Sequence, residues 1–122
     1  MVIVSKILIA ILALEHFYFL YLEMFLWTTA RGRKAFGTTE EFALASKVLA
    51  ANQGLYNGFL GAGLVWVLLA PAELAKPLAF FFAGCVLVAG LYGGATANKR
   101  IYILQALPAA LTLIAVLLLG VG

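Results

Sequence analysis

The chain is poor in charge: only 11% of its 122 residues are Asp, Glu, Lys or Arg, against about 25% in an average soluble domain. Hydrophobic residues make up 66%, well above the roughly 45–50% of soluble domains. A soluble fold would lack the polar side chains needed to cover this apolar material. The composition therefore excludes a soluble enzyme, a nucleic-acid-binding domain and a disordered tail, and it indicates an integral membrane protein.

The chain also has few residues for metal or redox chemistry. A single cysteine, Cys85, rules out an intrachain disulfide or a cysteine cluster. A single histidine, His16, rules out a site built on two imidazoles of one chain. Together with Glu15 and Glu23 it offers at most three ligands, and adjacent helix residues diverge. We predict no metal site, and the sequence does not indicate a cofactor.

Long apolar stretches take up most of the chain. Four of them have about the length that a helix needs to cross the hydrocarbon core of a membrane. They cover approximately residues 2–27, 42–70, 78–95 and 101–121. The connections are short, which forces neighbouring helices to run antiparallel. The sequence therefore predicts an all-α fold, with residues 1–122 forming a single transmembrane domain, an up-down-up-down four-helix bundle.

The connections carry cap and turn signals. Thr38 or Thr39 is a candidate cap for the second helix, because Glu40 and Glu41 follow in what would be its first turn. The stretch 71–77, which begins and ends with proline, is predicted to form a tight turn.

The positions of lysine and arginine predict an orientation. Five cations lie in the first and third connections, at Arg31, Arg33, Lys34, Lys99 and Arg100. Two lie on the opposite side, at Lys6 and Lys76. The side of a membrane that carries more Lys and Arg is normally cytoplasmic. We expect a multi-pass protein of the cell (inner) membrane, with both termini outside and the first and third loops in the cytoplasm. Because the cations are spread along the chain, no nucleic-acid partner is expected.

Three ionisable residues interrupt the first apolar stretch. A charge at mid-membrane costs about 2.5–3.5 kcal/mol on insertion scales, so such residues are candidates for function. Glu15 and His16 lie near the middle of the predicted helix, and Glu23 lies nearer its cytoplasmic end. His16 and Glu23 are two helical turns apart and share one face. We take His16, Glu15 and Glu23 as candidate catalytic residues for acid/base chemistry.

Polar residues of the other helices form a candidate ligand-binding set. Counting equal rises from the expected helix ends puts Glu23 level with Lys47, and His16 level with Gln53. This predicts a polar pocket with a Glu23–Lys47 ion pair and a neutral layer around His16. The set comprises Lys47, Asn52, Gln53, Tyr56, Asn57, Tyr92 and Gln105. The alternative is that these residues only form hydrogen bonds that hold the helices together.

Small residues recur at helical spacing. Gly54, Gly58 and Gly61 form one strip, and Gly90 and Gly94 form another. Such strips let helix backbones approach closely. They favour tight packing within the bundle, or a homo-oligomer formed through the glycine faces.

Two motifs carry a family resemblance. The first runs from Leu14-Glu15-His16-Phe17-Tyr18 through Leu22-Glu23-Met24-Phe25-Leu26-Trp27, and the second is Ala50-Ala51-Asn52-Gln53-Gly54-Leu55-Tyr56-Asn57-Gly58. Together they resemble the small bacterial four-helix membrane family catalogued as domain of unknown function 1304. The resemblance implies a stand-alone four-helix membrane protein of this size, and it implies no activity.

Several functions remain open at this point. The first is acid/base chemistry in the membrane on a small hydrophobic or lipid-like ligand. The second is an oligomeric proton-coupled transporter or channel subunit, with Glu15 or Glu23 carrying the proton. The third is a structural scaffold, in which the polar cluster only holds the bundle together. Whether the chain is an enzyme is therefore left undecided.

Overall fold

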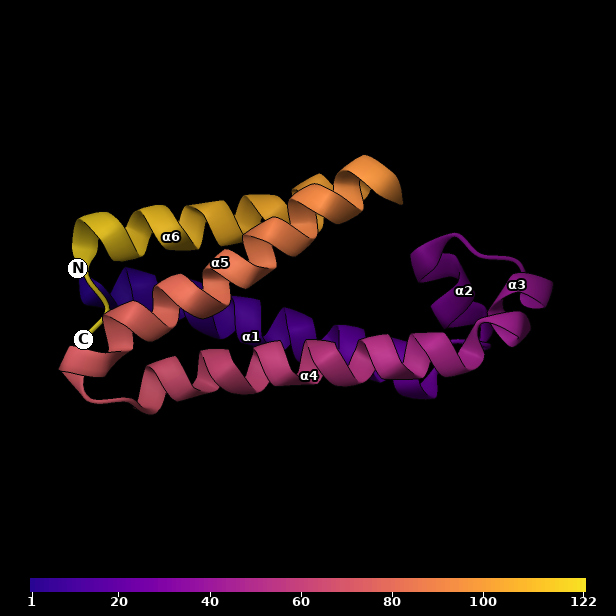
Figure 1. Ribbon diagram of the computed structural model, residues 1–122, viewed down its shortest axis with the longest axis horizontal. Helices are drawn as coiled ribbons and strands as arrows, with labels where there is room; N and C mark the ends of the chain where they lie inside the picture. The colour runs from indigo at the N-terminus through magenta and orange to yellow at the C-terminus, as the bar shows by residue number, and fades with distance from the viewer. The chain divides into compact units, whose positions relative to one another are not determined.

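The computed structural model describes all 122 residues, and every regular element in it is a helix (Figure 1). Four helices are long: α1 (Val2–Phe25), α4 (Lys47–Leu69), α5 (Ala72–Thr96) and α6 (Leu107–Leu119). Two are short, α2 (Ala30–Phe36) and α3 (Glu40–Ala45), and a π-helical segment, η1 (Tyr102–Ala106), leads directly into α6. The predicted all-α class is confirmed.

Three segments are long and apolar enough to cross a membrane: α1, α5 and the combined segment Tyr102–Leu119. The helix α4 has 23 residues, which is a sufficient length. It does not join the three because its Lys, Asn, Gln and Gly residues lower its hydropathy. Membrane-spanning capacity is therefore found in three of the four stretches for which it was predicted.

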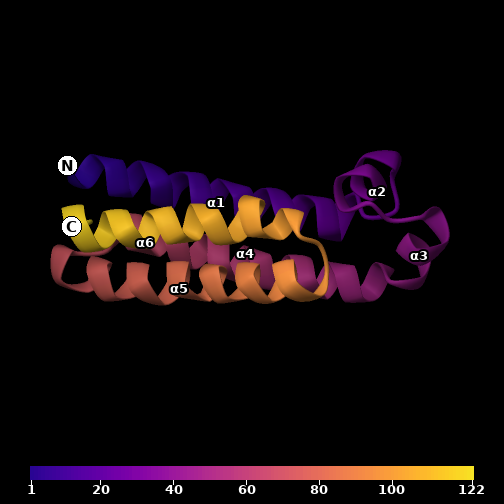
Figure 2. The ribbon, with the colours of Figure 1, turned by 90° about the horizontal axis from the view of Figure 1, so that it is seen from above.

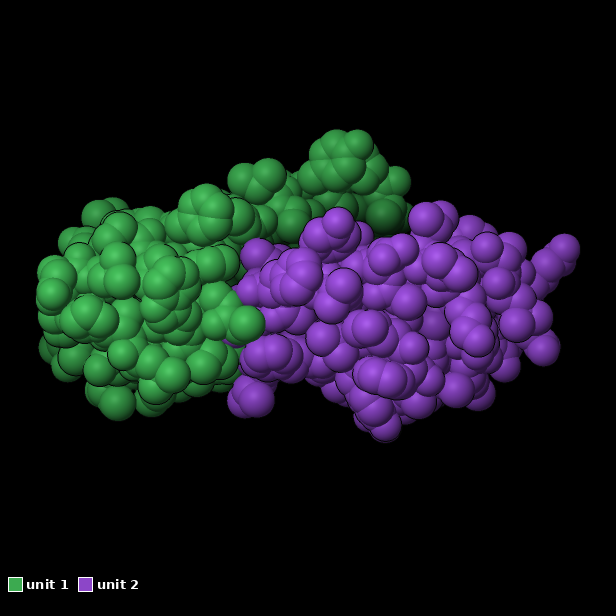
Figure 3. Space-filling model, turned by 60° about the horizontal axis from the view of Figure 1, so that its bottom comes forward, with its two compact units in different colours: residues 1–13, 62–122 green, residues 14–61 purple.

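The chain divides into two compact units (Figure 3). Unit 1 comprises residues 1–13 and 62–122, and unit 2 comprises residues 14–61. The helices α1 and α4 each contribute residues to both units.

In unit 1, α5 packs against η1 and α6 as an antiparallel hairpin (Figure 2). The buried residues of α5 are small and recur every three or four positions: Ala75, Ala79, Ala83, Val86, Gly90 and Gly94. The two backbones come so close that a Cβ atom on Gly90 would lie 2.5 Å from the backbone nitrogen of Ala106. The predicted glycine strip of the third helix is therefore a packing surface for η1.

A proline explains the change of helix type at the start of the last segment. In η1 the amide of Leu107 donates to the carbonyl of Tyr102, five residues back instead of four. Pro108 has no amide hydrogen, and its ring would clash with the carbonyl four residues earlier in a regular α-helix. The wider π turn relieves this clash. The hydroxyl of Thr112 then donates to the carbonyl of Pro108 at 2.8 Å.

Two predicted boundaries are wrong. Residues 71–77 do not form a turn, because α5 begins at Ala72 and Pro77 lies inside it. Pro77 is the sixth residue of α5 and has no amide hydrogen to donate to the carbonyl of Glu73, so the helix lacks one backbone hydrogen bond there. The second apolar stretch is also broken, at Ser46, into α3 and α4. The hydroxyl of Ser46 donates to the carbonyl of Phe42 at 2.7 Å, which also accepts the Ser46 amide at 2.9 Å, and the backbone of Ser46 leaves the helical region with φ −103° and ψ 8°.

The capping prediction holds for Thr39, although the helix that it caps is the short α3. Its hydroxyl oxygen accepts a hydrogen bond from the amide of Phe42 at 3.1 Å. Glu40 and Glu41 occupy the first turn of α3, where carboxylates are favoured by the helix dipole.

Candidate functional site

In unit 2, α1 and α4 pack through a strip of glycines. The three glycines of α4 are Gly54, Gly58 and Gly61, and the α1 side chains opposite them are, in order, Met24, Leu20 and Phe17. A Cβ atom on Gly54 would lie 2.8 Å from Cγ of Met24, and one on Gly58 would lie 2.5 Å from Cδ1 of Leu20. A Cβ atom at any of the three positions would require the α1 side chain opposite to shift, so the predicted role of the strip in packing is confirmed.

The order of these contacts fixes how α1 and α4 are aligned. Gly54 lies beside Glu23 and Met24, and Gly61 lies beside Phe17. Lys47 is seven residues, about 10 Å along the helix axis, from the level of Gly54. The predicted levels, which placed Glu23 opposite Lys47 and His16 opposite Gln53, are therefore wrong by about two turns. The count began at residue 42, whereas α4 begins at Lys47 and its first turns extend past the end of α1.

The central contact of this interface joins Glu23 and Asn57. The Asn57 side-chain amide, Nδ2, donates to Oε1 of Glu23 at 2.5 Å. Both side chains are buried, with 7% of Glu23 and 8% of Asn57 exposed. Lys47 lies exposed at the start of α4, so the predicted Glu23–Lys47 ion pair is replaced by a hydrogen bond from a neutral amide.

His16 is fully buried, with 0% of the residue exposed. Its ring packs edge-on against Phe19, with centroids 5.4 Å apart. Glu15, the next residue, is half-buried, and its Oε1 atom is buried without a hydrogen-bond partner. The two adjacent residues thus occupy different environments, as expected from the rotation of about 100° between helix neighbours.

On α4, the other members of the predicted ligand set do not join Glu23. Asn52, Gln53 and Tyr56 are exposed on α4, and 62% of Tyr56 is accessible. In unit 1, Gln105 is half-buried within η1 and Tyr92 is 72% exposed on α5. Within unit 2, Asn57 is the member of the set that joins an acidic residue of α1.

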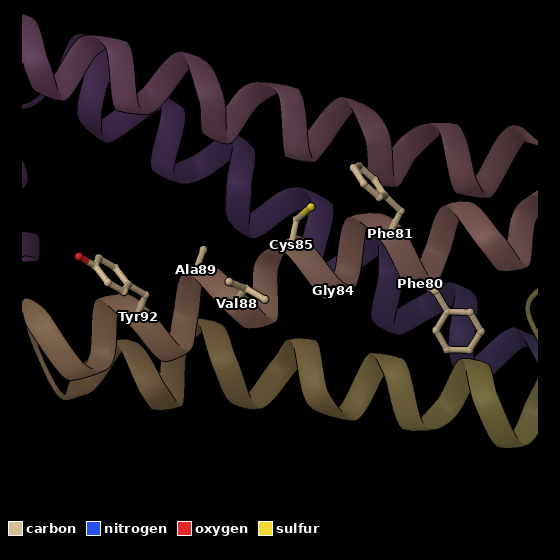
Figure 4. Close-up of a pocket in the computed structure, with 7 residues that line it drawn as sticks. All are labelled: Phe80, Phe81, Gly84, Cys85, Val88, Ala89 and Tyr92. Atoms are coloured by element: carbon tan, nitrogen blue, oxygen red, sulfur yellow. The ribbon is translucent and has the colours of Figure 1, made fainter.

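The structure has a surface depression, which lies on α5 and is apolar (Figure 4). Its lining residues all belong to this one helix: Phe80, Phe81, Gly84, Cys85, Val88, Ala89 and Tyr92. It is a shallow helix face and not an enclosed cavity. In unit 2, the expected polar pocket beside Glu23 is instead filled by Asn57 and by the close contact of Gly54 with α1. No group of three or more His, Cys, Asp or Glu residues is placed to hold a metal ion.

Two contacts of the first loop were not foreseen from the sequence. Arg31 of α2 reaches back to Tyr18 of α1, where Nη2 donates to the phenol oxygen at 3.1 Å. Its guanidinium carbon also lies 5.7 Å from the centre of the Tyr18 ring. The indole nitrogen of Trp27 donates to the hydroxyl of Ser46 at 3.0 Å. These pairs lie 13 and 19 residues apart across a helix end, where helical periodicity gives no signal.

The fold and the buried contacts define an all-α protein with membrane-length apolar helices and a Glu–Asn hydrogen bond between two of them. Residues 10–117 match the family described as Protein of unknown function (DUF1304). The Uncharacterized protein YpaA of Lactococcus lactis subsp. lactis (strain IL1403) is 35% identical over 119 residues, which cover 93% of this chain and 97% of that protein. No solved structure matches the chain. The chain belongs to the DUF1304 family, as its two motifs suggested.

Proposed function

We propose that this chain is a four-span membrane protein, with α4 as the span that hydropathy alone does not identify. The support comes from unit 2, where residues 54–61 of α4 pack against residues 17–24 of α1. Because α1 is apolar enough to cross a membrane, a helix packed along it lies at the same depth. The distribution of Lys and Arg supports a bundle in the bacterial cell membrane with both termini outside.

The function that we propose is acid/base chemistry on a small hydrophobic or lipid-like ligand that reaches the protein from the bilayer. The observation that carries it is the buried Glu23–Asn57 hydrogen bond, two turns along α1 from the fully buried His16. Packing alone does not require an imidazole and a carboxyl in one apolar helix, and inserting them is costly.

Each residue of this cluster has a distinct role in the proposal. The imidazole of His16 and the carboxyl of Glu23 both take up and release protons. The amide of Asn57 holds one oxygen of Glu23 and leaves the other for a ligand. The exposed polar residues of α4 in unit 2 would contact the same ligand as it approaches through the lipid: Lys47, Asn52, Gln53 and Tyr56.

The test is native mass spectrometry of protein gently extracted from its own membranes. A small molecule should remain bound to the wild type and be lost from His16→Ala. The matched control is Ser5→Ala, because Ser5 is another fully buried polar residue of α1. A wild type without a bound small molecule, or equal retention by His16→Ala, would contradict the proposal.

Glu15 favours a second candidate, an oligomeric proton-coupled transporter. Its Oε1 atom is buried without a hydrogen-bond partner, and a carboxyl in the middle of an apolar helix is typical of proton carriers. Proteoliposomes should then show flux driven by a pH gradient, and Glu15→Gln should abolish it. Equal flux in the wild type, Glu15→Gln and Glu23→Gln would rule this candidate out.

A further inference from the structure

The short helix α2 is held tightly against the end of α1. Thr29 caps it, with the side-chain oxygen accepting from the amide of Gly32 at 3.2 Å. Gly32 is buried, and a Cβ atom there would overlap the carbonyl oxygen of Leu26. This backbone contact gives α2 a defined position within unit 2.

The contact between Arg31 and Tyr18 sets the depth of α2. Tyr18 lies seven residues before the last residue of α1, which is about 10 Å along the helix axis. The guanidinium of Arg31 therefore lies alongside α1 and not beyond its end. For a membrane-spanning α1, whose 24 residues extend about 36 Å against about 30 Å of hydrocarbon core, this places Arg31 beside the last turns of the span, from where a long cationic side chain reaches the headgroups.

The cations of α2 are more numerous than the carboxylates that follow in α3, Glu40 and Glu41. Arg31, Arg33 and Lys34 form no ion pair with a carboxylate, and the partner of Arg31 is the phenol of Tyr18. The Nε atom of Arg33 is buried without a hydrogen-bond acceptor. Three cations and one unused buried donor thus lie on a helix of seven residues.

An aromatic pair accompanies these cations. The rings of Trp27 and Phe36 lie 4.9 Å apart, and the indole nitrogen of Trp27 is bonded to Ser46. Tryptophan is enriched at the depth of the lipid headgroups, because its ring is apolar and its N–H is polar. The pair places a fluorescent residue directly beside the basic helix.

We propose that Arg31, Arg33 and Lys34, together called the α2 surface, bind the phosphate of an anionic phospholipid headgroup, with the Trp27 ring beside them. Guanidinium groups match phosphate oxygens in two-point hydrogen bonds, and the uncompensated positive charge complements the lipid charge. The depth set by Tyr18 favours a lipid over a soluble partner. This inference rests on the membrane location of α1 and is independent of acid/base chemistry at His16 and Glu23.

The experiment measures quenching of Trp27 by brominated lipids in reconstituted vesicles. The chain has two tryptophans, so a Trp66→Phe background leaves Trp27 as the reporter. Vesicles contain either dibrominated phosphatidylglycerol or dibrominated phosphatidylcholine, each diluted into unlabelled lipid. From the quenching of Trp27 we expect the affinity for phosphatidylglycerol to be at least about five-fold higher than the affinity for phosphatidylcholine. This is the ratio that corresponds to about 1 kcal/mol, the attraction of one cation to an anionic membrane surface.

Two sets of variants separate the α2 surface from general charge attraction. Combined replacement of Arg31, Arg33 and Lys34 by Gln should remove the preference. The matched control is Lys99→Gln with Arg100→Gln, which removes cations from another loop and should keep it. The single variant Lys34→Gln, at an exposed position, should reduce the preference even if the triple variant does not fold.

The proposal is overturned if Trp27 is quenched equally by the two lipids, or if Lys99→Gln with Arg100→Gln reduces the preference as much as the α2 variants do. Binding of inorganic phosphate by the detergent-solubilised wild type, without a preference between the two lipids in vesicles, would assign the surface to a soluble anion and would overturn it too. A failure of both lipids to quench would remove the membrane location on which it rests. None of these results bears on ligand retention by His16.

Discussion

Two glycines of α5 allow a sharp test of the hairpin in unit 1. A Cβ atom added at Gly90 would lie 2.5 Å from the backbone nitrogen of Ala106 and 2.8 Å from its Cα. A Cβ atom added at Gly84 would meet nothing within 4 Å. The change Gly→Ala is therefore chemically identical at two sites on one helix, and only the neighbours differ.

The two substitutions should change stability in different directions. Replacing a helical glycine by alanine gains about 1 kcal/mol at either site. Forcing a methyl group into a packed site costs about 1–3 kcal/mol, and the obstacle at Gly90 is backbone, which cannot move aside as a flexible side chain can. Gly84→Ala should gain about 1 kcal/mol, and Gly90→Ala should lose up to about 2 kcal/mol. Their difference, about 1–3 kcal/mol, is independent of the helix-propensity term.

The assay is unfolding by SDS in mixed micelles, followed by far-ultraviolet circular dichroism. The midpoint for Gly84→Ala should lie above that of the wild type, and the midpoint for Gly90→Ala should lie below that of Gly84→Ala. If Gly90→Ala unfolds at or above the midpoint of Gly84→Ala, the close approach of α5 to Ala106 is refuted.

Three further predictions use the same titration. Asn57→Ala should lower the free energy of unfolding by about 1–2 kcal/mol, because it leaves the buried carboxyl of Glu23 without its donor. The control Asn52→Ala, at an exposed position, should stay within about 0.5 kcal/mol of the wild type. Equal losses in the two variants would show that the hydrogen bond does not contribute to stability. The free energy of unfolding of Lys47→Met should also stay within about 0.5 kcal/mol of the wild-type value. A larger loss would indicate that Lys47 does form an ion pair with Glu23. Gly37→Ala should lower the free energy of unfolding by about 1 kcal/mol or more, since Gly37 has a φ of +67°, which disfavours a residue with a side chain. An unchanged midpoint would contradict the left-handed backbone at the C-terminal end of α2.

The class of fold and the shared face of His16 and Glu23 could be predicted from the sequence. An apolar segment long enough to cross a membrane must be helical, because only a helix satisfies its own backbone hydrogen bonds in lipid. A separation of two turns places two side chains on one helix face, whichever helix packs against it. The glycine strips were also foreseeable, because Gly54 and Gly90 lie at helical spacing from other glycines.

The partner of Glu23 could not be predicted, because it depends on the axial position of α4 against α1. That position follows from the break at Ser46, which is marked by neither glycine nor proline. A hydroxyl that bonds the carbonyl four residues back occurs in continuous helices as well. The helical state of Pro77 was missed for a related reason, since a proline near the start of a helix and a proline in a turn have the same sequence signal.

The π turn of η1 has a consequence for how this segment tolerates changes in length. A bond from Leu107 to Tyr102 contains one residue more than a regular helical turn, so this stretch carries a surplus residue. Deleting Ile103, which is exposed, would remove the surplus residue and leave the flanking residues facing α5, although the Pro108 ring would then meet the carbonyl that the π turn moves away. The same deletion at Val88, in the regular part of α5, would rotate every residue beyond it by about 100°. Length variation among relatives should therefore collect at residues 102–106, and α5 should keep a constant length.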